Sequence, residues 1–137
     1  MIGIITKNRV LKVNEFSFLK EVSKICITGG SGFIGSNLIQ SLLKKTSKKI
    51  ISLDNYSSGS TRNHISSNKV KYVVGDTYEI EKKISKYTKK IHSVFHFGEF
   101  ARIYQSFEDF DKCYHSNSVG TKAVFKYCLD KKNKGLT

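Results

Sequence analysis

The sequence has little of the chemistry that disulfide frameworks, metal sites and membrane spans require. It contains three cysteines, Cys26, Cys113 and Cys128, and no C-x-x-C pair. An odd cysteine count without such a pair argues against a disulfide framework and against a zinc or redox motif, and it favours a reducing, cytoplasmic compartment. No apolar run approaches the length of a membrane span, and residues 1–5 are too short for a signal-peptide core. We therefore expect no bound metal and no membrane partner.

Arginine is scarce as well, although the chain is strongly basic. The net charge is +13, from 24 Lys and Arg against 11 Asp and Glu, yet only Arg9, Arg62 and Arg102 are arginines. Nucleic-acid binders usually gather arginines and aromatic side chains in one patch, whereas here the lysines are spread in short runs. We interpret these lysines as solvated surface that can also attract an anionic nucleotide, and we expect no nucleic-acid partner.

Glycine, by contrast, is concentrated in one stretch. A short apolar strand at residues 25–27 is followed by four glycines within seven residues, Gly29, Gly30, Gly32 and Gly35. Two registers fit, G-x-G-x-x-G from Gly30 and G-x-x-G-x-x-G from Gly29. An amphipathic helix is expected next, and its apolar face is predicted to carry Ile34, Leu38, Leu42 and Leu43.

This order of strand, glycine turn and helix is the arrangement that receives a pyrophosphate. The amides of the turn and the N-terminus of the helix point at the anion, and the helix dipole adds partial positive charge. Glycines allow the tight turn, the approach of the phosphates and close packing of the helix on the strand. The alternative is an ordinary strand-to-helix turn that happens to be rich in glycine.

A second apolar strand, residues 49–54, ends in Asp54, which lies 19 residues after Gly35. This is close to the spacing of about 20 residues expected for the carboxylate that binds the adenosine ribose. Such a carboxylate accepts hydrogen bonds from the ribose hydroxyls and repels a 2′-phosphate, so Asp54 favours NAD over NADP. The alternative is an acid that merely ends a strand.

The remaining pattern predicts an α/β fold. Strands are expected at residues 70–74 and 91–98, with Ile80 and Ile84 at helical spacing between them. A last helix is expected from about Asn117, and its core candidates are Val119, Val124, Phe125 and Leu129. We interpret His96, within the last strand, as a buried, hydrogen-bonded histidine. The order β-α-β-x-β-α-β-α predicts a Rossmann-like doubly wound parallel sheet.

We divide the chain into an N-terminal extension, residues 1–22, and a partial dinucleotide-binding domain, residues 23–137. Within the extension, Ile2, Ile4 and Ile5 are candidates for a short strand, and Asn14 is a candidate cap for a helical turn.

Taken together, these motifs resemble the extended short-chain dehydrogenase/reductases, in particular the NAD-dependent sugar-nucleotide epimerases and dehydratases of the UDP-glucose 4-epimerase type. The resemblance covers about residues 24–130. The matching segments are residues 28–36, residues 53–55 with Gly59, residues 75–76, residues 94–98, and Asn117 with residues 120–121.

The resemblance implies an NAD-binding site. At the pyrophosphate it implies Gly29, Gly32, Phe33, Ile34 and Gly35. Around the adenosine it implies Asp54, Asn55, Tyr56, Ser57, Ser58, Gly59, Asp76 and Thr77. On the path toward the nicotinamide it implies Phe97, Gly98 and Glu99, and Asn117 resembles the family asparagine of the following helix.

The chain also departs from the family pattern. Glu99 stands where small residues are usual, and the loop that follows lacks the proline common there. The family's Tyr-x-x-x-Lys pair lies on a helix after a fifth strand, which is where this sequence ends. Two other matches are misplaced and are rejected as chance occurrences, Tyr78 with Lys82 and Tyr127 with Lys131.

We therefore predict a fold that is incomplete at its C-terminus, no catalytic residue in this chain, and an inactive chain by itself. A nucleotide-sugar substrate and a homodimer are expected only of the full-length enzyme. Two alternatives stay open: a non-catalytic module that binds a dinucleotide or docks a partner, and, ranked last, a basic nucleic-acid binder.

Overall fold

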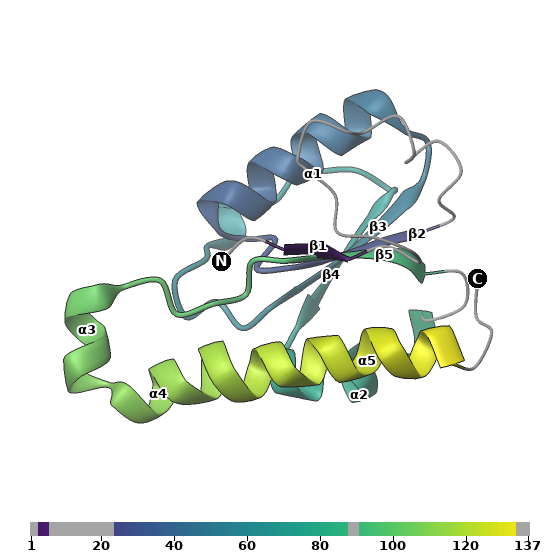
Figure 1. Cartoon of the computed structure of the whole chain (residues 1–137). Helices are drawn as coiled ribbons and strands as arrows, with labels where there is room; N and C mark the ends of the chain where they lie inside the picture. The colour runs from purple at the N-terminus through teal and green to yellow at the C-terminus, as the bar shows by residue number, and fades with distance from the viewer. Residues whose placement is uncertain (1–2, 6–23, 88–90, 134–137) are drawn as a thin grey trace.

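The computed structural model describes residues 3–5, 24–87 and 91–133, and they form one five-stranded sheet with helices on both faces (Figure 1). Four strands are parallel, in the order β5-β2-β3-β4. They are β2 (Lys24–Thr28), β3 (Lys49–Asp54), β4 (Val70–Val74) and β5 (Ile91–His96). This order and the flanking helices confirm the predicted Rossmann-like α/β fold.

Helix α1 (Phe33–Lys45) covers one face of the sheet, and α2 (Ile80–Ile84) and α5 (Thr121–Asn133) cover the other (Figure 1). The chain runs from β5 to α5 through α3 (Ile103–Glu108), α4 (Phe110–Tyr114) and a π-helical segment, η5 (His115–Gly120). Short 3-10 turns complete the structure: η2 (Thr61–Asn63), η3 (Thr77–Glu79) and η4 (Ser85–Tyr87).

Each face of the sheet has its own apolar core, because successive side chains of a strand point to opposite faces. Under α1, Ile25 and Ile27 of β2 pack with Ile39 of the helix. On the other face, Cys26 of β2 packs among residues that include Ile80 and Val124. Burial on both faces explains the largely apolar sequences of β2, β3 and β5, whereas the edge strand β4 is only partly buried.

The apolar face predicted for α1 is partly wrong. Ile39 is fully buried, whereas Ile34 is 49% exposed. The helix begins at Phe33, and the stripe that faces the sheet runs through Gly35, Ile39 and Leu42. Ile34 lies one position before that stripe, so its side chain is turned toward solvent at the start of the helix.

The prediction for the last helix also needs correction. Helical structure begins at Ile103, well before Asn117. Of the predicted core residues Val124 is buried, but Phe125 is 50% and Leu129 57% exposed, and Tyr127 is buried in their place. Within the described part of the chain, α5 packs against β5, α2 and η3, and its outer surface, with Phe125 and Leu129, faces solvent.

Part of the N-terminal extension belongs to the sheet. Strand β1 (Gly3–Ile5) pairs antiparallel with β5, with Ile4 opposite Phe95. This confirms a short strand at Ile4 and Ile5, while Ile2 and the helical turn proposed at Asn14 lie outside the described residues. β1 occupies the edge of β5 that would otherwise present unpaired backbone groups.

The corrected face of α1 predicts that the same substitution, isoleucine to alanine, lowers stability strongly at one position and hardly at another. We expect Ile39→Ala to lower the free energy of unfolding by about 2–5 kcal/mol, because it leaves a cavity under the helix. Ile34→Ala is the matched control, and we expect it to change stability by no more than about 0.5 kcal/mol. Urea unfolding of both variants measures the difference, and equal losses would contradict the assigned face.

The position of β1 predicts that it limits self-association through the edge of β5. We expect deletion of residues 2–5 to raise the share of dimers and larger species, measured by size-exclusion chromatography with light scattering, since the uncovered edge can pair with another chain. Deletion of Ile2 alone, which leaves Gly3–Ile5 in place, is the control. Identical size distributions for the two deletions would contradict this role.

Candidate functional site

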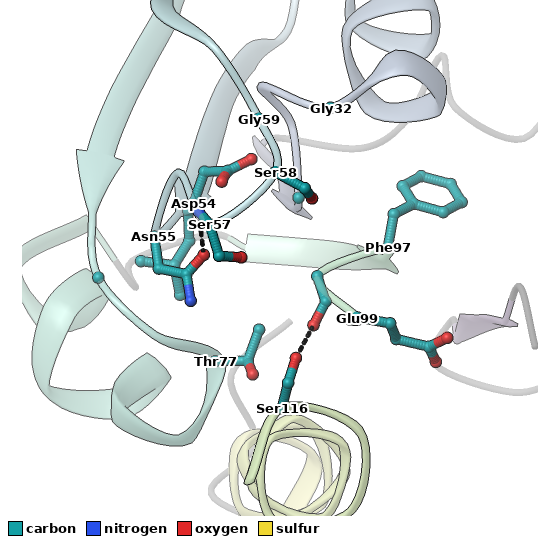
Figure 2. A pocket seen from close by; sticks show the side chains of 14 residues that line it. Gly32, Asp54, Asn55, Ser57, Ser58, Gly59, Thr77, Phe97, Glu99 and Ser116 are labelled. Atoms are coloured by element: carbon teal, nitrogen blue, oxygen red, sulfur yellow. Dashed lines mark hydrogen bonds between the residues drawn. The ribbon is translucent and has the colours of Figure 1, made fainter. Parts of the chain in front are cut away.

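A pocket lies at the carboxyl ends of β2, β3 and β5, where a parallel sheet of this kind binds its ligands. Figure 2 shows Asp54, Asn55 and Ser57 on one side and Phe97 and Glu99 on the other. The predicted site residues that line it are Gly29, Gly32, Asp54, Asn55, Ser57, Ser58, Gly59, Thr77, Phe97, Gly98 and Glu99.

The glycine turn is packed so closely that side chains are excluded at both of its ends. Gly29 has a φ of +70°, and a Cβ there would lie 2.6 Å from the carbonyl carbon of Phe97. A Cβ on Gly35 would lie 2.7 Å from the Cα of Gly30. Gly32, between them, lines the pocket and precedes α1, whose first amides have no partner within the helix. The turn therefore has the form of an anion-binding site.

Asp54, the last residue of β3, is hydrogen-bonded to this turn. Its Oδ2 accepts the backbone N–H of Ser31 at 2.8 Å, and its Oδ1 accepts the N–H of Tyr56 at 2.8 Å. Each carboxylate oxygen can accept a further hydrogen bond, so the group remains able to bind ribose hydroxyls. Beside it, the Asn55 side chain donates to Asp76 at 2.5 Å, which connects the ends of β3 and β4.

At the end of β5, a hydrogen-bonded network fixes the state of His96. Thr28 Oγ1 accepts the N–H groups of Phe97 and Gly98, each at 3.2 Å, so its own proton is directed at His96 Nδ1, 2.6 Å away. Nδ1 is therefore an acceptor, and Nε2–H donates to Thr121 Oγ1 at 3.0 Å. Burial lowers the pKa of His96, and Glu99 partly offsets this. His96 is thus neutral, and its burial and two hydrogen bonds confirm the predicted buried, hydrogen-bonded histidine.

Asn117 lies close to this region, but its side chain is directed at the loop after β5. Its Oδ1 accepts the N–H of Phe100 at 2.6 Å, and its Nδ2 donates to the carbonyl of Phe100 at 3.0 Å. The neighbouring Ser116 lines the pocket instead. In this structure Asn117 holds the loop that carries Gly98 and Glu99.

Other predicted site residues also lie outside the pocket lining. Phe33 and Ile34 are exposed in the first turn of α1, and Gly35 is buried beneath the glycine turn. The Tyr56 hydroxyl contacts His64, and the Asp76 carboxylate accepts a hydrogen bond from Asn55. The lining residues that the sequence reading missed are Leu53, Gly75 and Ser116. Leu53 and Gly75 flank Asp54 and Asp76, and they could have been found by treating every carboxyl end of a parallel strand as part of the site. No signal in the sequence singles out Ser116.

Among the described residues, neither the thiols of Cys26 and Cys128 nor the hydroxyls of Tyr78 and Tyr127 line this pocket. Burial raises the pKa of Cys26 to about 12 and that of Cys128 to about 11, so both thiols stay protonated. Tyr127 of α5 is buried in the core between that helix and the sheet, and this burial raises its pKa. Tyr78 is exposed on η3, and its pKa is raised mainly by the charge of Asp76. Within the described ranges, no cluster of His, Cys, Asp or Glu could hold a metal ion, and no helix is long and apolar enough to span a membrane.

The fold and site define a Rossmann-type dinucleotide-binding unit, and the sequence comparisons identify its family. The profile of the "NAD dependent epimerase/dehydratase family" matches residues 25–136. This chain belongs to that family. It is 33% identical over 119 residues to a dTDP-D-glucose 4,6-dehydratase of Dictyostelium discoideum, an alignment that covers 82% of this chain and 27% of the relative.

Solved structures agree with this assignment. An epimerase from Methanothermobacter thermautotrophicus is 26% identical with a TM-score of 0.72, covering 82% of this chain and 35% of that protein. A UDP-glucose 4-epimerase from Thermus thermophilus, solved in complex with NAD, is 25% identical with a TM-score of 0.64, covering 77% and 33%. The chain thus spans about a third or less of the length of these relatives.

The neutral state of His96 predicts a pH dependence of stability. Above about pH 6.5 the ring is neutral in both the folded and the unfolded chain; below it the unfolded chain binds the proton first, because burial lowers the folded pKa. We expect His96→Gln, which removes this titration, to lie closer in stability to the wild type at about pH 5.5 than at about pH 7.5. Urea unfolding at both pH values measures this, and a constant difference would contradict it.

Proposed function

We propose that this chain is the NAD-binding portion of a nucleotide-sugar epimerase or dehydratase. The observation that carries the proposal is the bond between the Ser31 amide and the Asp54 carboxylate, which brings the glycine turn and the ribose-binding acid to one pocket. The family is NAD-dependent by its description, and relatives with similar folds include epimerases solved with NAD.

The residues present fit this cofactor. The N-terminus of α1 offers backbone amides directly after Gly32, a position without a side chain, which suits a pyrophosphate. The Asp54 carboxylate, at the end of the neighbouring strand, suits the two ribose hydroxyls of NAD and disfavours a 2′-phosphate. Glu99 and Phe97 lie on the far side of the pocket, where we place the nicotinamide end.

When bound in the full enzyme, NAD would supply reversible hydride transfer at a sugar carbon that bears a hydroxyl group. The residues of this chain bind and orient the cofactor for that exchange. Neither Tyr78 nor Tyr127 is placed to act as the acid or base, so we expect this chain alone to be inactive. On its cysteine content we place the protein in the cytoplasm, and we assign nucleotide-sugar binding and dimer formation to the full-length enzyme.

One observation favours a second candidate, a non-catalytic dinucleotide-binding module. Strand β1 covers the edge of β5, so the described part of the chain already has a protected edge there. Such a module would use the same pocket without performing the reaction. The two candidates differ in activity with nucleotide sugars and agree in binding NAD.

The proposed function predicts cofactor-selective stabilisation. We expect NAD at 100 times its Kd to stabilise the chain by about 2.7 kcal/mol, and NADP at the same concentration to stabilise it far less, because Asp54 repels the 2′-phosphate. A thermal-shift titration with each cofactor measures this. Absence of any response to NAD would overturn the proposal.

Gly32→Ala separates cofactor binding from folding. A Cβ on Gly32 would meet only the Gly29 carbonyl oxygen, at 3.4 Å, so we expect the unliganded melting temperature to stay near that of the wild type. The added methyl group stands where the pyrophosphate must approach the backbone, and we expect at least about tenfold weaker NAD binding. Unchanged NAD affinity would show that the phosphates bind elsewhere.

A further inference from the structure

His64 lies outside the pocket lining and belongs to none of the motifs in the sequence, yet it contacts two segments that carry lining residues, the glycine turn and the loop after Asp54. Its Nε2 is 3.2 Å from the Ser31 hydroxyl, in the glycine turn, and 2.9 Å from the Tyr56 hydroxyl, in the loop after Asp54. Tyr72 of β4 holds the face of the imidazole, because the two rings stack with centroids 3.7 Å apart and an interplanar angle of 8°.

Ser31, on the other side of this contact, is fully buried and bonded through each of its polar groups. Its amide donates to Asp54. Its carbonyl oxygen accepts the Ser60 N–H at 3.0 Å and the Asn63 side-chain amide at 2.8 Å. With the His64 contact to its hydroxyl, the centre of the glycine turn is held almost entirely by the segment that follows β3.

Tyr56 is the second residue that His64 holds, and its backbone is strained. It has a φ of +60°, a conformation that side-chain-bearing residues seldom adopt. Its N–H bond to Asp54 and its hydroxyl contact with His64 compensate for this strain. The direction of the ribose-binding loop therefore depends on the same imidazole nitrogen as the glycine turn.

We propose that His64 is a positioning residue of the cofactor site, which holds the phosphate-binding turn and the ribose-binding loop at the separation that one dinucleotide needs. This inference rests on the proposed NAD binding. His64 acts through Ser31 and Tyr56 and does not touch the cofactor. Nε2 has a single proton or lone pair, so the hydroxyls of Ser31 and Tyr56 share that one hydrogen-bonding position. This shared contact sets the affinity for the cofactor, while the stacking of His64 on Tyr72 contributes to stability.

Two substitutions separate these contributions. His64→Phe keeps a ring against Tyr72 and removes the nitrogen, so we expect NAD binding weaker by about tenfold. Its melting temperature should fall less than that of a variant without the ring, since only the contacts to Ser31 and Tyr56 are lost. His64→Gln keeps a polar atom that can reach the two hydroxyls and removes the ring. We expect it to bind NAD within about threefold of the wild type and to melt at a lower temperature. Affinity and stability thus rank the two variants in opposite orders.

A double-mutant cycle tests whether His64 acts through the glycine turn. We expect Ser31→Ala to weaken NAD binding by part of the loss seen in His64→Phe, which also loses the contact to Tyr56. The double variant should bind little more weakly than His64→Phe alone, because both changes remove the contact that Ser31 and His64 share. His92→Phe, the same substitution near the amino end of β5 and away from the pocket, is the control and should keep wild-type affinity.

Isothermal titration with NAD and with ADP-ribose, which lacks only the nicotinamide, measures these effects. Equal losses for the two ligands are expected, since His64 holds the adenosine side. If the wild type binds NAD and His64→Phe binds it equally well, the positioning role is wrong while the proposed function stands. If the wild type binds neither ligand, the proposed function itself is overturned, and this inference with it.

Discussion

The structure of the site depends on one interaction, the hydrogen bond from the Ser31 amide to the carboxylate of Asp54. Ser31 belongs to the turn that leaves β2, and Asp54 is the last residue of the adjacent parallel strand β3. Because the carboxyl ends of parallel strands meet at one edge of the sheet, a turn that can bind phosphate and an acid that can bind ribose become neighbours. The bond keeps the carboxylate oriented toward the turn, and it gives one buried amide of that turn a partner.

The opposite side of the pocket is held by uncharged groups. Thr28 links the end of β2 to the backbone after β5, and the neutral ring of His96 extends this link to Thr121 of α5. Gly29 allows the turn to approach the backbone of Phe97 at a distance that excludes a side chain. The three strand ends therefore form one connected framework, and the loops that line the pocket are short extensions of it. Such a framework orders the site before a ligand binds, which lowers the entropy lost on binding.

Several features of the fold could be predicted from sequence because they depend on residues close together in the chain. The glycine turn follows from backbone sterics, the strands from continuous apolar runs, and α2 from the spacing of Ile80 and Ile84. The predictions failed where packing against distant residues decides. Periodicity alone did not separate Ile34 from Ile39 on α1, and it assigned Phe125 and Leu129 to a core that α5 does not form within the described structure. For Asn117, the bonds of its side chain to Phe100 are invisible in the sequence, since a loop and two short helices separate the two residues.

The sequence by itself determined the type of fold, the phosphate-binding form of the turn and the acid at the end of β3, because these are properties of local conformation and of spacing along one strand–turn–helix unit. Only the tertiary structure decided how the site is held together. His64 reaches Ser31 from 33 residues away, His96 reaches Thr28 from 68, and β1 pairs with a strand near residue 95. Contacts over such separations follow from the order of strands in the sheet and from the path of the loops between them. No periodicity or short motif records those relations, because they arise only when the chain has folded.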